Sequence, residues 1–246
     1  MDLTENILSL LIWLPIAGGA GVLFIGDAGD STTRRAGQMR WMALGVSVLT
    51  FLVSIPLYTQ FDTTTAAMQF VERAWWIGAL NVEYYLGVDG ISAPLILLTT
   101  FITPLVIIAG WDSIKVRPAQ YFAAFLILEG LMVGVFSALD GILFYVLWEA
   151  MLVPMFLIIG IWGGERRIYA TIKFFLYTFL GSVLMLVAFI YLYNKTGNFN
   201  FFDFMDEPLT LREQQFIFIA FLLALSLIHI SEPTRPAPLS RMPSSA

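Results

Sequence analysis

The sequence of 246 residues contains no cysteine, one histidine and few charged residues. Without cysteine the chain can form no disulfide, no thiolate metal site and no cysteine-ligated iron–sulfur cluster. Charged residues make up 13% of the chain and hydrophobic residues 59%, and the mean hydropathy is +0.81. Because a soluble domain of this size has no interior large enough to bury so much apolar surface, the composition predicts an integral membrane protein.

Several sequence signals are missing as well. The amino terminus carries Asp2 and Glu5 where a signal peptide would be basic, so the first apolar stretch is predicted to be a retained helix. We find no phosphate-binding glycine loop, metal-ligand cluster or nucleophile–base pair. We therefore expect no redox or hydrolytic chemistry, no cofactor and no metal in this chain, and no nucleic-acid partner.

Seven apolar segments are each long enough to cross a bilayer core of about 30 Å, and helices are the form that satisfies the backbone in lipid. The period-2 alternation of a membrane barrel is absent. The sequence thus predicts an all-α membrane protein with about seven transmembrane helices. The segments are Ile7–Ile25, Trp41–Tyr58, Ile91–Gly110, Ala119–Ala138, Ile142–Trp162, Ile168–Tyr193 and a seventh from about Gln215.

Basic residues alternate between the connections and predict the orientation in the bilayer. Seven lie in the odd-numbered connections: Arg34, Arg35, Arg40, Lys115, Arg117, Arg166 and Arg167. Three lie in the other connections: Arg73, Lys195 and Arg212. By the positive-inside rule, the odd-numbered connections face inward and the amino terminus faces outward. Aromatic residues at segment ends fit interfacial belts: Trp41, Trp111, Tyr121, Trp162, Tyr191 and Tyr193.

The outer connections contain little that suggests chemistry. Residues 59–90 hold β-branched and aromatic runs around Gly78 and Asn81, which predict a short hairpin; an interfacial amphipathic segment is the alternative. The short turn 139–141 is predicted to expose Asp140 to water.

The sequence changes character at about Ser226. Four prolines and four serines lie between Ser231 and Ala246. We therefore divide the chain into a transmembrane domain, residues 1–225, and a tail, residues 226–246. The tail is expected to be disordered and to derive from out-of-frame or adapter DNA rather than from the native gene.

Glu149 is an acidic residue near the middle of the fifth apolar segment. A charge at mid-bilayer costs about 2.5–3.5 kcal/mol or more, so intramembrane acids are functional candidates by default. Pro154 follows five residues later and leaves the carbonyl of Ala150 without its helical donor, which predicts a kink beside the carboxyl group. We therefore expect Glu149 to handle protons. The alternative is a protonated side chain that hydrogen-bonds between helices for packing alone.

Glu129 is a second acid near mid-span. Its neighbours Gly130 and Gly134 form a small-xxx-small pair that lets another helix approach closely. A proton relay and a single interhelical hydrogen bond are equally consistent with its position.

Lys173 lies a few residues inside the sixth segment. It is predicted to extend to the inner surface, with an ion pair to Glu149 as the alternative. Pro104 predicts another kink, where threonine hydroxyls can satisfy freed carbonyls. The threonines are Thr99, Thr100 and Thr103.

Three stretches resemble the antiporter-like subunits of proton-pumping NADH–quinone oxidoreductase (respiratory complex I), and among these the subunit M, or chain 4, family. They are Leu86–Thr100, Phe144–Gly164 and Lys173–Val187. The most specific feature is the Trp-Glu pair with a proline five residues after the glutamate. The resemblance covers nearly all of residues 1–225.

The resemblance implies a proton-translocating, non-redox subunit that works with other membrane subunits in a bacterial cytoplasmic or mitochondrial inner membrane. NADH, FMN, iron–sulfur clusters and quinone are expected on other subunits. Family members have fourteen helices in two inverted five-helix repeats, and the acid matching Glu149 pairs with a lysine on the seventh helix. SLIHIS (226–231) stands where that lysine is expected. We thus expect an amino-terminal fragment with the first repeat unfinished and no complete channel.

Three alternatives stay open. The chain can belong to a sodium/proton exchanger or an energy-converting hydrogenase, which have related membrane subunits. It can be a membrane scaffold whose acids serve helix packing, or a truncated, non-functional fragment.

Overall fold

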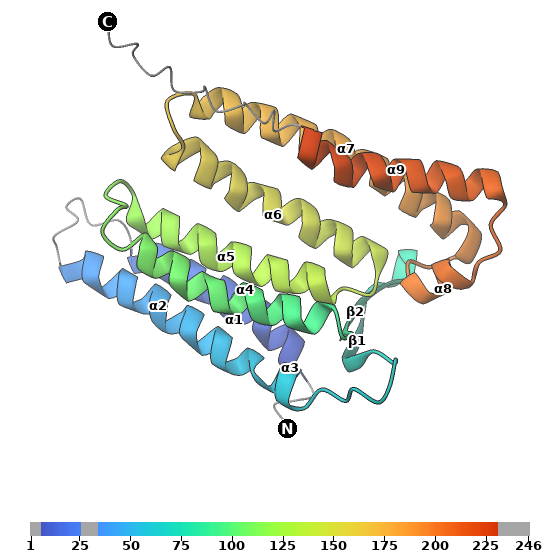
Figure 1. The fold of residues 1–246 in the computed structure, drawn as a ribbon, viewed down its shortest axis with the longest axis horizontal. Helices are drawn as coiled ribbons and strands as arrows, with labels where there is room; N and C mark the ends of the chain where they lie inside the picture. The colour runs from blue at the N-terminus through green and yellow to red at the C-terminus, as the bar shows by residue number, and fades with distance from the viewer. Residues whose placement is uncertain (1–5, 26–33, 231–246) are drawn as a thin grey trace, which may run out of the picture.

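A computed structural model of the chain describes residues 6–25 and 34–230, in which long helices dominate (Figure 1). Six helices in these residues are long and apolar enough to cross a membrane, and they coincide with the first six predicted segments. The long helices are α1 (Ile7–Ile25), α2 (Arg34–Ser54), α4 (Ser92–Ala109), α5 (Pro118–Ser137), α6 (Gly141–Trp162), α7 (Arg167–Thr196) and α9 (Leu211–Ile230). The short elements are α3 (Pro56–Thr59), β1 (Gln69–Ile77), η1 (Gly78–Leu80), β2 (Val82–Val88) and α8 (Phe201–Asp206).

The seventh predicted segment is also helical. It forms α9, which begins slightly before Gln215 and is not among the six candidate spans. α9 continues past Ser226 to Ile230, so the predicted domain boundary falls inside a helix. Residues 231–246 lie outside the described residues, and the non-native tail stays a prediction.

Consecutive long helices run in opposite directions, so their connections lie at the two ends of the bundle (Figure 1). The start of α1, the β1–β2 hairpin, the α5–α6 turn and α8 lie at one end, which the charge pattern predicts to be outer. The α4–α5 and α6–α7 connections lie at the other end, where Trp162 Nε1 donates a hydrogen bond to the Val116 carbonyl at 2.7 Å. The first inner connection, residues 26–33, is outside the described residues.

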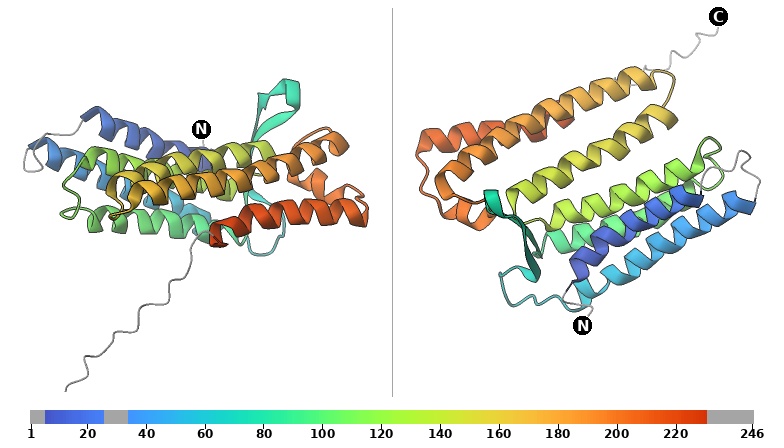
Figure 2. Two further views of the ribbon diagram at one scale, coloured as in Figure 1. Left: turned by 90° about the horizontal axis from the view of Figure 1, so that it is seen from above. Right: turned by 180° about the vertical axis from the view of Figure 1, so that it is seen from behind.

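Helix α5 occupies the centre of the bundle and contacts α1, α2, α4 and α6. The two views of Figure 2 show the remaining helices continuing outward from α6 to α7. Gly130 makes the closest approach, because a Cβ atom there would collide with the backbone carbonyl of Ile12. At Gly134 an added Cβ would lie 2.9 Å from Leu147 of α6. The predicted small-residue contact is thus confirmed, with α1 and α6 as the partners.

The predicted hairpin is confirmed in the outer connection. β1 and β2 pair antiparallel, and Asn81 closes the turn in the left-handed conformation with φ 50°. Glu72 of β1 is buried and holds the hairpin against α1. Its carboxylate accepts hydrogen bonds from the backbone N–H of Leu8 at 2.6 Å and of Ser9 at 3.1 Å, and from the Ser9 hydroxyl. These N–H groups belong to the first turn of α1 and have no acceptor within the helix.

The prediction that Asp140 faces water is wrong: the residue is 2% exposed. Its carboxylate caps α6 by accepting from the N–H groups of Ile142 and Leu143 at 2.9 and 3.0 Å, and it also accepts from the N–H of Glu83 at 3.2 Å. Burial raises the pKa of Asp140, and these hydrogen bonds lower it by less. The turn was expected to be exposed because it is short and polar, but β2 and the segment around Asn200 cover it.

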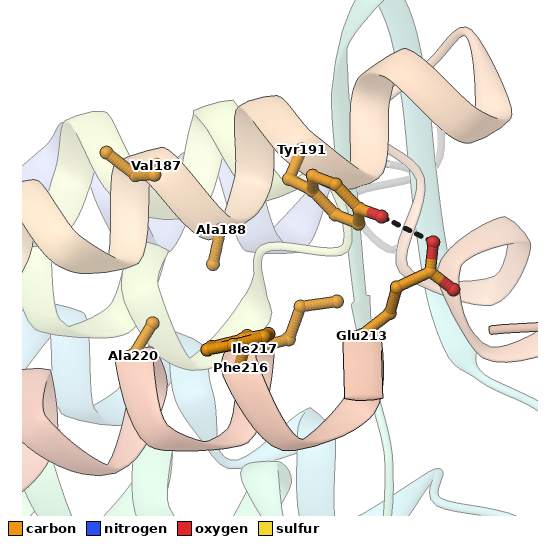
Figure 3. A pocket seen from close by; sticks show the side chains of 7 residues that line it. All are labelled: Val187, Ala188, Tyr191, Glu213, Phe216, Ile217 and Ala220. Atoms are coloured by element: carbon orange, nitrogen blue, oxygen red, sulfur yellow. Dashed lines mark hydrogen bonds between the residues drawn. The ribbon is translucent and has the colours of Figure 1, made fainter. Parts of the chain in front are cut away.

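Helix α9 packs on α7 and is fixed at its outer end by polar contacts. Glu213 accepts a hydrogen bond from the Tyr191 hydroxyl at 2.5 Å and pairs with Lys195 at 2.9 Å. Beside this contact lies an apolar groove of about 280 Å³ between the two helices (Figure 3). Its walls include Val187 and Phe216. Contact between the helices therefore depends on the polar end as well as on apolar packing.

Candidate functional site

Glu149 lies near the middle of α6, where the sequence predicts it. Its side chain is half-buried, and its Oε1 atom is buried without a hydrogen-bond partner. The Ser182 hydroxyl of α7 lies near the carboxyl group. Its own hydrogen bond is donated to the carbonyl of Thr178 at 2.8 Å. Sequence reasoning missed Ser182, because a lone serine in an apolar helix gives no signal of its neighbours.

Pro154 is buried within α6, which continues as a helix to Trp162. Proline has no N–H, so the carbonyl of Ala150, next to Glu149, lacks its helical donor. Pro154 also lines a cavity of about 370 Å³ between α1, α5 and α6. Gln120 is the polar side chain on the cavity wall, which is otherwise apolar. The freed carbonyl of Ala150, the acid Glu149 and the cavity at Pro154 thus lie within two turns of α6.

Glu129 is the most buried acid of the site, with 1% of its surface exposed. Neither carboxylate oxygen has a hydrogen-bond partner. The interhelical hydrogen bond that a packing role requires is therefore not formed. The side chain lines a cavity of about 260 Å³ between α4 and α5, and Thr99 and Thr103 lie on its wall. Burying a carboxyl group without a hydrogen-bond partner destabilises the folded protein. A buried acid of this kind inside a membrane span is therefore a candidate functional residue.

Lys173 does not pair with Glu149. The ion pairs formed between described residues do not include it, and its ammonium group lies 5.7 Å from the Tyr177 ring centroid. The side chain is half-buried near the inner end of α7. The ion-pair alternative is thus absent from this structure, and the position fits the predicted extension to the inner surface.

Pro104 lies inside α4 and frees the carbonyl of Thr100, four residues earlier. The nearby hydroxyls bond to other carbonyls: Thr103 Oγ1 donates to that of Thr99 at 3.0 Å, and Thr99 Oγ1 to that of Leu95 at 2.8 Å. The predicted bond from a threonine hydroxyl to the freed carbonyl is not formed between the described residues. Thr100 Oγ1 contacts Ser54 Oγ of α2 at 2.8 Å. The hydrogen bond between Ser54 and Thr100 links α2 to α4. Thr99 and Thr103 form part of the wall of the Glu129 cavity.

A third cavity lies beside the one at Glu129. It measures about 410 Å³ and lies between α5, α6 and α7. Leu128 and Met132 line both cavities, while Trp148 and Thr178 lie next to Glu149 and one turn from Ser182. Neither acid lines this cavity, whose wall is almost entirely apolar. Among residues 6–25 and 34–230, no three His, Cys, Asp or Glu side chains gather as a metal site requires.

Comparison with known proteins connects this arrangement to one family. The model described as "NADH-ubiquinone oxidoreductase chain 4, amino terminus" matches residues 38–136. The model described as "NADH:quinone oxidoreductase/Mrp antiporter, TM" matches residues 138–231. The two models meet at the α5–α6 turn, so together they cover the hairpin and both acids.

Among relatives, NADH-quinone oxidoreductase subunit M of Rhodobacter capsulatus is 47% identical over 91% of this chain and 45% of its own length. NADH-ubiquinone oxidoreductase chain 4 of Arabidopsis thaliana is 42% identical over 89% of this chain and 43% of its own length. The chain thus spans about half the length of the curated relatives it matches.

Solved structures agree with these matches. A chain of respiratory complex I from Thermus thermophilus has a TM-score of 0.76 at 27% identity, covering 91% of this chain and 45% of that one. A chain of the Mrp complex from Dietzia sp. has a TM-score of 0.75 at 16% identity, over 89% of this chain and 23% of that one, which shows a shared fold. Together with the spans, these matches indicate a multi-pass protein of the bacterial or mitochondrial inner membrane.

The motif around Glu149, the helix order and the sequence matches agree, and the chain belongs to the family of antiporter-like membrane subunits of NADH–quinone oxidoreductase, in its subunit M, or chain 4, branch.

Proposed function

We propose that this chain forms part of a proton-translocating subunit of respiratory NADH–quinone oxidoreductase. Its substrate is the proton, and electron transfer takes place elsewhere in the complex. NADH, FMN, iron–sulfur clusters and quinone bind to other subunits, and the neighbouring membrane subunits are its partners. The names of the relatives support this proposal, as does the Thermus thermophilus complex.

The observation that carries the proposal is Glu149. The side chain is an acid at mid-span with one buried oxygen that has no partner, and it sits beside a hydroxyl and a proline-disrupted carbonyl. If the position served helix packing alone, a neutral side chain with all its hydrogen bonds formed would fill the same space at a lower free-energy cost than an acid. A buried oxygen without a partner leaves the acid free to take up and release a proton.

Proton movement then follows from electrostatics. A cation that moves toward the carboxylate of Glu149 favours the ionised acid, and its withdrawal favours proton uptake. Glu129 is the second acceptor, and it lines the cavity between α4 and α5. Lys173 is the basic residue placed to exchange protons with the inner surface.

The test is Glu149→Gln in the full-length subunit of an assembled complex. Glutamine keeps the size and hydrogen bonds of the side chain but does not titrate. We expect NADH-driven proton pumping and coupled electron transfer to be lost or sharply reduced, while the complex still assembles. Glu149→Asp should be milder. Glu165→Gln, an exposed acid in the α6–α7 connection, is the matched control and should pump like wild type.

If Glu149→Gln pumps like wild type, the acid is structural and Glu129→Gln becomes the decisive variant. A cation/proton antiporter is the second candidate, because the family model over residues 138–231 includes Mrp antiporters by its description. Sodium-dependent proton flux without NADH in vesicles would favour that function, and pumping that requires NADH oxidation would exclude it.

A further inference from the structure

The outer end of α6 and α7 separates a polar space from an aromatic one. A polar pocket of about 490 Å³ is lined by residues of β1, β2, α8 and the outer ends of these helices. Figure 1 shows that these elements lie at the same end of the bundle. Polar and charged side chains line most of it. The lining side chains that carry charge or an amide are Arg73, Asn81, Glu83, Asp140, Asn198, Asn200 and Asp203.

Two short segments form the boundary of this pocket. Asn81 and Glu83 line the pocket, while Val82 between them is fully buried in the aromatic cluster beneath. Likewise Asn198 and Asn200 line the pocket, and Phe199 between them joins the cluster. Each segment thus has polar side chains on the pocket and an apolar side chain in the cluster.

Beneath the pocket lies a layer of six phenylalanines, called here the aromatic layer. Phe189 of α7 is its centre and is 1% exposed. The Phe189 ring centroid is 6.0 Å from that of Phe201, 6.4 Å from that of Phe144, and 5.2 Å from that of Phe221. The aromatic layer comprises Phe144, Phe189, Phe199, Phe201, Phe204 and Phe221.

The aromatic layer lies between the outer pocket and Glu149. On α6, Asp140 lines the pocket and Glu149 follows nine residues later, about 13 Å along the helix axis. On α7, Phe189 is seven residues from Ser182, which is two turns on the same face and about 10 Å. Met185 between them is 2% exposed. An added Cβ on Gly141 would lie 3.1 Å from the Phe189 ring, so no gap remains at the top of α6.

We propose that the aromatic layer, centred on Phe189, is the barrier that prevents protons on outer water from reaching Glu149. The inference rests on the proposed function of Glu149. It names the residues that prevent Glu149 from exchanging protons with water on the outer side. Water can fill the polar pocket, whereas the packed phenylalanine rings below offer no hydrogen-bond partner. A proton that crossed them would pass from outer water to the Glu149 carboxylate and collapse the gradient.

The experiment measures passive proton leak with the full-length subunit in the assembled complex. Phe189→Ala and Phe201→Ala complexes are reconstituted into liposomes, a pH step is imposed without NADH, and its decay is followed with a pH-sensitive dye. We expect a severalfold faster decay in both variants. Phe201 is less buried, so its variant tests the barrier even if Phe189→Ala does not assemble. Phe189→Leu should stay close to wild type.

Two comparisons separate a specific leak from general damage. Phe179→Ala removes a ring from the same helix where 45% of the side chain is exposed, and it should not leak. Adding Glu149→Gln to either leaky variant should slow the leak again, because the proposed path passes through that carboxylate on its way to the inner side. The proposal is overturned if both phenylalanine variants are as tight as wild type, or if their leak persists with Glu149→Gln.

Failure of the barrier and failure of the proposed function give different results. NADH-driven pumping by the single Glu149→Gln variant tests that function without touching the aromatic layer. If Glu149→Gln stops pumping and the layer variants stay tight, only the barrier is wrong. If Glu149→Gln pumps normally and the layer variants leak regardless of it, both proposals fail.

Discussion

Removing the Glu72 carboxylate should detach the outer hairpin from α1. In Glu72→Ala, the N–H of Leu8 loses a buried acceptor, which costs about 1–3 kcal/mol. Loss of the negative charge at the amino end of α1 adds about 0.3–2 kcal/mol. Water can replace part of the bonds to Ser9, which are only partly buried. The expected destabilisation is therefore roughly 2–4 kcal/mol.

A change of 1 kcal/mol shifts the melting temperature of a protein this size by about 2–4 °C, so we expect a fall of roughly 5–15 °C. The assay is the temperature at which the detergent-solubilised chain loses its monodisperse elution peak, at one heating rate. Glu83→Ala is the matched control on the other strand. Glu83 pairs at 2.5 Å with Arg73, and the two side chains are 14% and 56% exposed. Because Arg73 lies largely in solvent, the pair is expected to contribute about 0–1 kcal/mol.

Glu72→Gln should lie between wild type and Glu72→Ala, because the amide oxygen still accepts one hydrogen bond. A Glu72→Ala melting temperature equal to that of Glu83→Ala would refute the reasoning. It would mean that apolar packing alone holds the hairpin on α1.

Three further predictions concern packing, pH and orientation. Gly130→Val places side-chain atoms against the backbone of α1 and should destabilise the chain by about 1–3 kcal/mol or more, whereas Gly45→Ala, where nothing lies within 4 Å, should be neutral in the same elution assay. Burial raises the pKa of Asp140, so its stabilising contribution is present below its ordinary pKa of 3.8 and is lost as pH rises through the higher folded-state value. Melting temperatures measured across that window should fall more steeply for wild type than for Asp140→Asn; equal slopes would contradict this. In Lys115→Cys an impermeant thiol reagent should react from the inner side, and in Ala79→Cys from the outer side; the opposite result would reverse the topology.

The spans and the hairpin were predictable because local patterns determine them. Twenty-residue apolar runs leave helix as the sole solution in lipid, and alternating β-branched and aromatic residues around Asn81 indicate a tight turn. The small-residue pair at Gly130 predicted a close helix contact, although not that α1 would be the partner. These features depend on neighbours in the sequence, so the sequence alone was sufficient.

The site was predictable only in part. Glu149 and Glu129 stand out because acids are expensive in apolar helices, and this holds whatever their neighbours are. The position of Ser182 near Glu149 depends on how α7 is rotated against α6, which no local sequence pattern encodes. Asp140 was misassigned because the two segments that bury it come from β2 and from beyond α7. Glu72 was missed because its hydrogen-bond donors lie 63 and 64 residues away in the sequence.

The close contact between α1 and α5 also constrains how the chain assembles during synthesis. Gly130 is made about 120 residues after α1 begins, which takes roughly 6–24 s at about 5–20 residues per second. Glu72, the cap of α1, also comes later than the helix that it caps. Until Glu72 is made, the first turn of α1 must take its hydrogen bonds from interfacial water. Until α5 is made, α1 packs mainly on α2 and the β1–β2 hairpin. Insertion must therefore keep an incompletely packed helix pair in the bilayer until α5 arrives.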